Sequence, residues 1–164
     1  SLFKIKSLDK VFFKSPGFFF NRYIKHPFYS YSVYLLRGDR DNQVGLIATR
    51  TDTHNNFNIL RIVDFFGDDI VFSYLGKGLN ILMNQINAIY CDFWCYGLNE
   101  TVISDTGFIN NTLSKDFIVP TYFEPFVNEN VDIKIAFKGT SNSHIKYVFK
   151  GDGDQDRPNI LLIS

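Results

Sequence analysis

The sequence has few residues that could cross-link the chain, ligate a metal or hold the chain in a membrane. Its 164 residues include 2 cysteines and 3 histidines. The histidines are scattered, so their spacing predicts neither a metal site nor a catalytic triad. No uncharged apolar run is long enough to cross a bilayer, and the start lacks the apolar region of a signal peptide. Two cysteines without an export signal predict a cytoplasmic protein.

An excess of charge of either sign is also lacking. Lys plus Arg and Asp plus Glu both number 17, so no net charge attracts nucleic acid or an anionic membrane. The basic residues are dispersed along the chain and form no nucleic-acid-binding motif. We therefore expect neither nucleic acid nor a membrane as a partner. The chain begins Ser1-Leu2 without Met. We interpret residues 1–164 as a single domain that is a fragment or the C-terminal half of a longer protein. A homodimer, or contact with a missing N-terminal domain, is left open.

What the sequence does have is apolar periodicity, with 18 Phe and 9 Tyr. The first half predicts two short helices and a three-stranded meander. We expect the helices at residues 8–14, ended by Pro16-Gly17, and at 18–25, and the strands at 29–35, 44–50 and 57–66, with turns at 38–42 and 52–56.

The second half alternates helices with strands. We expect a helix from residues 67–69 to about 87, a strand at 89–96, a short helix capped by Asn99 and ended by Gly107, and a hairpin of 131–138 with 144–150. Gly76 and Gly78 each cost a helix about 1 kcal/mol relative to Ala, which suggests close packing there. The crossover helix predicts that strands 57–66 and 89–96 are adjacent and parallel in a mixed sheet with helices on both faces, an α+β fold.

The most distinctive stretch is residues 151–159, Gly-Asp-Gly-Asp-Gln-Asp-Arg-Pro-Asn. Its opening resembles a calcium loop, but Arg157 and Ile163 stand where such a loop needs Gly and Glu. We instead predict a tied loop in which Asp152, Asp154 and Asp156 brace Arg157, which is presented to a sugar or phosphate oxygen. Asp64 or Glu124 could also pair with Arg157. The alternative is a solvated polar turn.

The order of elements over residues 18–150 resembles the GNAT fold of acyl-CoA-dependent N-acyltransferases. Four stretches are similar to a GNAT-like group found among bacterial surface-polysaccharide and amino-sugar genes: Arg22-Tyr23 with His26-Pro27-Phe28-Tyr29, residues 60–65, residues 122–126 and residues 151–159. The resemblance implies that the two parallel strands splay apart and that the pantetheine arm of acetyl-CoA, or of another acyl-CoA, lies between them. It implies transfer of the acyl group to an amine of a sugar or nucleotide-sugar.

The chain departs from the family pattern at two places. The glycine-rich loop that binds the cofactor's pyrophosphate reads Phe66-Gly67-Asp68-Asp69 here, where two carboxylates would repel phosphates. The family's general-acid tyrosine falls on Ile103. These departures support an alternative function, a non-catalytic GNAT-like module that binds a sugar, a partner domain or another subunit.

The resemblance and the residue types together nominate site residues. Asp64, in the middle of an apolar strand, is the first candidate base, and Glu124, in a long irregular segment, is the second. The backbone of Phe65, Phe66 and Gly67 would hold the thioester carbonyl. The alternative for Asp64 is a structural carboxylate that is bonded to backbone amides, to Arg61 or to Arg22. The alternative for Glu124 is an ordinary surface carboxylate.

The strand at residues 89–96 nominates a substrate pocket. Alternation places Tyr90, Asp92, Trp94 and Tyr96 on one face, where aromatic rings around a carboxylate are typical of a sugar or acyl site; simple aromatic packing is the alternative. Cys91 and Cys95 fall on the other face as buried, inert thiols, with α-carbons about 13 Å apart, too far for a disulfide.

Overall fold

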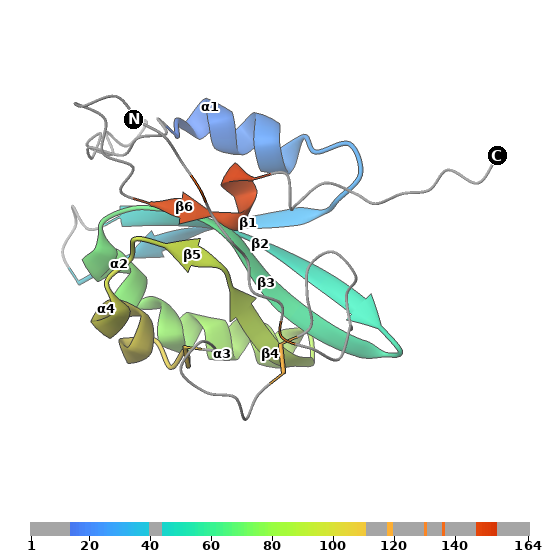
Figure 1. Ribbon diagram of the computed structural model, residues 1–164. Coiled ribbons are helices and arrows are strands. Elements are labelled where there is room, and N and C mark those ends of the chain that lie inside the picture. The colour runs from blue at the N-terminus through green and yellow to red at the C-terminus, as the bar shows by residue number, and fades with distance from the viewer. Residues whose placement is uncertain are drawn as a thin grey trace.

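The structure, a computed structural model, describes residues 14–39, 44–110, 118–119, 130, 136 and 147–153. Within these residues the chain forms an α+β fold around a mixed four-stranded sheet of order β1-β2-β3-β4 (Figure 1). A second, two-stranded sheet joins β5 and β6. The strands are β1 (Tyr31–Arg37), β2 (Val44–His54), β3 (Phe57–Phe66), β4 (Ala88–Phe93), β5 (Cys95–Tyr96) and β6 (Val148–Phe149). The helices are α1 (Pro16–Phe19), the π-helix η1 (Phe20–Ile24), α2 (Asp69–Ser73), α3 (Leu75–Gln85), α4 (Glu100–Asp105) and the 3-10 helix η2 (Lys150–Asp152).

The meander and the parallel crossover are both confirmed. β1 pairs with β2 and β2 with β3 in antiparallel fashion, whereas β3 and β4 are parallel. The predicted turn at residues 52–56 is too long, because β2 continues to His54. Asn55 and Asn56 make the turn with φ values of 48° and 67°. Asparagine tolerates this left-handed conformation, which two-residue hairpin turns require.

Two apolar layers cover the sheet, one on each face (Figure 1). On the first face, Ile62 and Phe65 of β3 pack with Phe72 of α2 and Leu79 of α3. On the second face, Phe19 of α1 and Tyr23 of η1 pack on Ala48, Val63 and Phe66. Helices therefore lie on both faces, as the sequence predicts.

The long helix predicted after β3 is interrupted. α2 ends at Ser73, and α3 begins at Leu75. Only one of the two glycines is in close packing: a Cβ on Gly76 would lie 3.0 Å from the carbonyl oxygen of Thr106, whereas one on Gly78 would have no atom within 4 Å. The prediction of close packing is thus confirmed for Gly76 and wrong for Gly78.

The capping signals of the following helix are confirmed. The Asn99 side chain accepts a 2.8 Å hydrogen bond from the backbone N–H of Thr101 at the start of α4. Gly107 follows the helix with φ 89°, a conformation that favours glycine. Towards the other end of the chain, Pro16 begins α1. Proline is favoured in the first turn of a helix, where its missing N–H costs nothing.

Two predicted elements lie largely outside the described residues. These are the helix at residues 8–14, of which the structure describes only Lys14, and most of the hairpin at residues 131–150. The described end of the hairpin, β6, pairs antiparallel with β5. This pairing carries residues 147–153 onto the end of β3, where the candidate site lies (Figure 1).

Candidate functional site

A bulge places Asp64 on the face of the sheet that α1 and η1 cover. Ala48 is opposite Asp64, and Thr49 is opposite Ile62, so the β2–β3 register shifts there. A bulge of this kind gives one strand an extra residue and redirects its side chains. Val63 contacts Tyr23 in the second apolar layer, and Asp64 also faces Tyr23.

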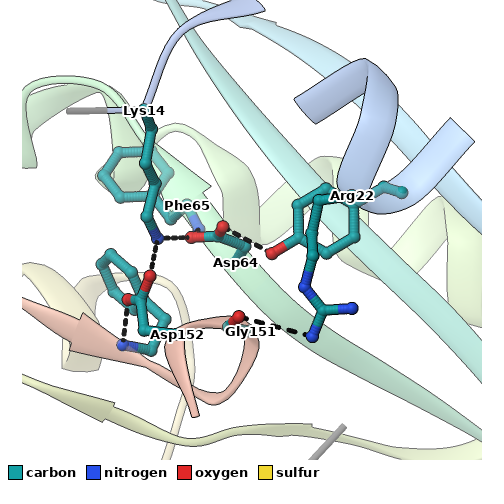
Figure 2. A network of polar contacts seen from close by, with 8 residues as sticks. Lys14, Arg22, Asp64, Phe65, Gly151 and Asp152 are labelled. Atoms are coloured by element: carbon teal, nitrogen blue, oxygen red, sulfur yellow. Dashed lines mark hydrogen bonds and ion pairs between the residues drawn. The ribbon is translucent and has the colours of Figure 1, made fainter. Parts of the chain in front are cut away.

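The Asp64 carboxylate is completely buried and is surrounded by donors (Figure 2). Lys14 forms an ion pair with Oδ1, the backbone N–H of Phe65 donates to Oδ1 at 2.8 Å, and the Tyr23 hydroxyl donates to Oδ2 at 2.6 Å. The backbone amide was among the predicted partners of a structural Asp64. Arg61 and Arg22 were also predicted as partners, but Lys14 and Tyr23 take their place. Arg61 instead pairs with Asp52, and Arg22 donates to the carbonyl oxygen of Gly151.

Lys14 joins this carboxylate to the beginning of the glycine–aspartate stretch. Its Nζ atom is also 2.8 Å from Asp152 Oδ1, and the other carboxylate oxygen of Asp152 accepts from the backbone N–H of Phe149 at 2.9 Å (Figure 2). We call Lys14, Tyr23, Asp64 and Asp152 the Lys14 cluster. It brings together two residues that precede the sheet, one strand residue and one residue near the C-terminus. Asp152 was predicted to brace Arg157, which lies outside the described residues; in the structure, Asp152 pairs with Lys14.

Burial dominates the electrostatics of the Lys14 cluster. It raises the pKa of Asp64 to about 6, with Lys14 acting in the opposite direction and Asp152 adding to the increase. Burial, followed by the charge of Asp64, also raises the pKa of Tyr23 far above its ordinary value, so the hydroxyl keeps its proton and remains a donor.

Gly151 fits where no other residue would. A Cβ at this position would lie 2.1 Å from the Tyr23 hydroxyl oxygen and 3.0 Å from the carbonyl oxygen of Val63. The Arg22 guanidinium lies 3.5 Å from the Gly151 carbonyl oxygen, a long hydrogen bond. η2 therefore packs directly against the backbone of β3.

The parallel strands part in the middle of β3. Their pairing ends at Ile62 opposite Phe93, while β3 continues to Phe66 and the chain after β4 enters β5. Phe149 fills the space between them: its ring centroid lies 6.2 Å from that of Phe65 and 5.8 Å from that of Phe93. We call this region the β3–β4 opening.

The predicted cofactor-binding residues, Phe65, Phe66 and Gly67, lie at the end of β3 and are all buried. Phe65 and Phe66 belong to opposite apolar layers. A Cβ on Gly67 would be 3.0 Å from the α-carbon of Gly45, so the glycine serves close packing of two backbones. Beyond it, Asp69 accepts a 2.6 Å hydrogen bond from the Tyr147 hydroxyl.

A second polar cluster crosses three strands of the sheet in register. Arg50 of β2 is opposite Arg61 of β3, and Arg61 is opposite Asp92 of β4. Asp52 bridges the two guanidiniums, with Oδ1 3.0 Å from Arg50 Nε and Oδ2 2.8 Å from Arg61 Nε. Arg61 Nη1 lies 3.7 Å from Asp92 Oδ2. We call these four residues, with Tyr90, the Arg61 row.

Asp92 ends this row in an environment that disfavours its charge. Burial raises its pKa to about 6, an increase that Arg61 and then Lys150 oppose. Neither oxygen of Asp92 accepts a hydrogen bond from a described residue. The buried Tyr90 hydroxyl likewise makes no hydrogen bond with the described residues. Burial, together with Asp92, raises the pKa of Tyr90 to about 12.

Trp94 and Tyr96 do not continue the strand that carries Asp92. β4 ends at Phe93, Trp94 lies between strands, and Tyr96 is an exposed residue of β5. The predicted single face from Tyr90 to Tyr96 is therefore wrong, because the chain leaves β3 there to pair with β6. Cys91 and Cys95 are half-buried free thiols against the first apolar layer, and burial raises the pKa of each, that of Cys95 to about 12.

The remaining predicted site residues, Glu124, Asp154, Asp156 and Arg157, lie outside the described residues. Sequence reasoning missed Lys14, Arg50 and Asp52, and it considered Arg61 only as a partner of Asp64. A signal existed for Arg61, a charged residue between Leu60 and Ile62 in an apolar strand, which burial forces to find a counter-charge. None existed for Lys14, because its partners are 50 and 138 residues away along the chain.

Comparison with known proteins adds no family assignment: no protein-family model, curated protein or solved structure significantly matches the chain. In the part of the chain that the structure describes, no three His, Cys, Asp or Glu residues are grouped as a metal site would need. No helix in that part is both long and apolar enough to span a membrane.

Proposed function

We propose that the protein is a GNAT-like module that binds a small polar ligand or a partner without transferring an acyl group from CoA. One observation carries this proposal: the β3–β4 opening, where the GNAT resemblance implies the pantetheine arm, is occupied by Phe149 of the same chain. η2 lies beside it against β3, with Gly151 in contact with Tyr23 and Val63. A cofactor arm would have to displace both.

The surroundings of the opening support the same proposal. The place of the pyrophosphate loop carries Asp68 and Asp69, and the second of these is already bonded to Tyr147. Backbone amides near two carboxylates are a poor site for phosphate, because the like charges repel. Both oxygens of the buried Asp64 carboxylate already have donors, Lys14 and the Phe65 amide at Oδ1 and the Tyr23 hydroxyl at Oδ2. An incoming amine would have to compete with these donors.

The second candidate function is the acyltransferase itself, with Asp64 or Glu124 as base and the backbone of residues 65–67 holding the thioester carbonyl. The observation that favours it is the parting of the parallel strands after Ile62 and Phe93, the feature that the GNAT resemblance implies for cofactor binding. This function requires Phe149 and η2 to leave the opening and Asp64 to exchange Lys14 for an acceptor amine.

Calorimetric titration with acetyl-CoA separates the two candidates. We expect no binding at millimolar cofactor in a preparation of the full chain that unfolds cooperatively. A dissociation constant below about 0.1 mM, or about −5.5 kcal/mol, would place the acyltransferase first. Titration with CoA lacking the acetyl group is the matched control, because a thioester site distinguishes the two cofactors and an adventitious nucleotide site does not.

A further inference from the structure

The Arg61 row is a set of hydrogen-bonding groups that the Lys14 cluster does not use. Its members come from three adjacent strands and share one sheet face, since Arg50, Arg61 and Asp92 are directly opposite one another. Asp92 is only 7 % exposed, and its two oxygens, like the Tyr90 hydroxyl, lack hydrogen bonds with described residues. A buried carboxylate in that state costs free energy unless donors reach it.

We propose that the Arg61 row binds an uncharged ligand with several hydroxyl groups, such as a sugar ring. This inference rests on the proposed binding function and gives that function a place and a ligand class. A hydroxyl group both donates and accepts. It can therefore donate to Asp92 and accept from the hydroxyl of Tyr90.

The charges of the row disfavour the two obvious charged ligands. An ammonium group could donate to Asp92, but Arg61, Lys150 and Arg50 already act on that carboxylate as positive charges. A phosphate could pair with the cations, but it would meet the carboxylates of Asp92 and Asp52 and has no proton to donate to them in its dianionic form. A neutral hydroxyl avoids both repulsions.

The exposed end of the row indicates the approach of the ligand. Asp52 keeps 22 % of its side chain exposed, and Tyr90 is half-buried, whereas Arg61 is 1 % exposed. The ligand therefore enters past Asp52 and Tyr90. Tyr29 flanks this end, with its ring centroid 4.1 Å from the Arg50 guanidinium carbon and 5.4 Å from that of the stacked His26 ring. Aromatic rings beside polar groups are typical of small-molecule sites.

The test is calorimetric titration of the full chain with three neutral probes and two charged ones. The neutral probes are D-glucose, D-galactose and N-acetylglucosamine; the charged ones are D-glucosamine and glucose 6-phosphate. We expect at least one neutral probe to bind, and its charged relatives to bind at least tenfold more weakly. Asp92→Asn and Tyr90→Phe should each weaken the neutral probe at least fivefold. Asp105→Asn, at an exposed carboxylate of α4, is the matched control and should leave binding unchanged.

Three results would overturn the inference: no neutral probe binds, a charged probe binds as well as its neutral relative, or Asp92→Asn and Tyr90→Phe change thermal stability while leaving affinity intact. Tyr90→Phe keeps the test decisive if Asp92→Asn does not fold. Titration of the same preparation with acetyl-CoA keeps the two proposals separate. Binding of acetyl-CoA contradicts the proposed function, whereas failure of the sugars alone contradicts only this inference.

Discussion

The Tyr23 hydroxyl offers the sharpest test of the Lys14 cluster. Tyr23 is 1 % exposed, and its hydroxyl donates a 2.6 Å hydrogen bond to an Asp64 carboxylate that is fully buried. Tyr23→Phe removes the hydroxyl group and leaves the ring in place against Phe19 and Val63. The substitution therefore deletes one donor of the carboxylate with little change in apolar packing.

The expected loss of stability follows from the charge of the acceptor. A hydrogen bond to a charged group contributes about 1.5–3 kcal/mol, and water cannot easily replace the donor at a buried site. The Asp64 carboxylate keeps Lys14 and the Phe65 amide, so the loss should stay within this range. For a chain of this length, each kcal/mol lowers the midpoint of thermal unfolding by about 2–4 °C. We thus expect a decrease of about 3–12 °C.

Urea denaturation at pH 7, followed by tryptophan fluorescence, measures the change in the free energy of unfolding. Tyr34→Phe is the matched control, because Tyr34 is a half-buried tyrosine of β1 whose hydroxyl makes no hydrogen bond with the described residues. We expect the control to change stability by less than about 0.5 kcal/mol. If Tyr23→Phe is no more destabilising than Tyr34→Phe, the assignment of Tyr23 as a donor to a buried, charged Asp64 is wrong.

Three further predictions test other parts of the structure. Gly78→Ala should stabilise the protein by about 0.5–1 kcal/mol, whereas Gly76→Ala should not. The reason is that a Cβ at Gly76 would lie 3.0 Å from the carbonyl oxygen of Thr106, just after α4, while a Cβ at Gly78 would meet no atom within 4 Å. Equal effects of the two substitutions in urea denaturation would contradict this. Asn99→Ala should lower the free energy of unfolding by about 0.5–2 kcal/mol, because α4 loses its cap. Asn99→Asp should retain most of that stability, because its side chain can also cap the helix. The folded-state pKa of Asp92 is about 6, above its ordinary value of 3.8, so the folded state holds its proton more tightly and stability falls as pH rises from about 4 to about 6. The stability of the native chain relative to Asp92→Asn should therefore decrease by about 3 kcal/mol over that interval; a difference that is independent of pH would contradict the burial of an ionisable Asp92.

Much of the fold could be predicted from the sequence because its signals are local. A strongly apolar run that follows turn residues predicted β3 with its observed bounds, Phe57–Phe66. Asn99 and Gly107 predicted the ends of α4 through hydrogen bonding and backbone conformation at single positions. The crossover helix required β3 and β4 to be parallel, since a helix between two strands reverses the chain direction twice.

The sequence by itself also determined that Asp64 and Asp92 needed partners, because a carboxylate in an apolar strand cannot stay buried alone. Only the tertiary structure decided which partners those are. Lys14 comes from before the first strand and reaches Asp64 because a bulge in β3 turns that carboxylate towards α1. Asp152, from near the C-terminus, then pairs with Lys14. The ion pairs of Arg61 depend in the same way on the register of three strands. Such contacts join residues far apart in the chain, and no local pattern encodes their pairing.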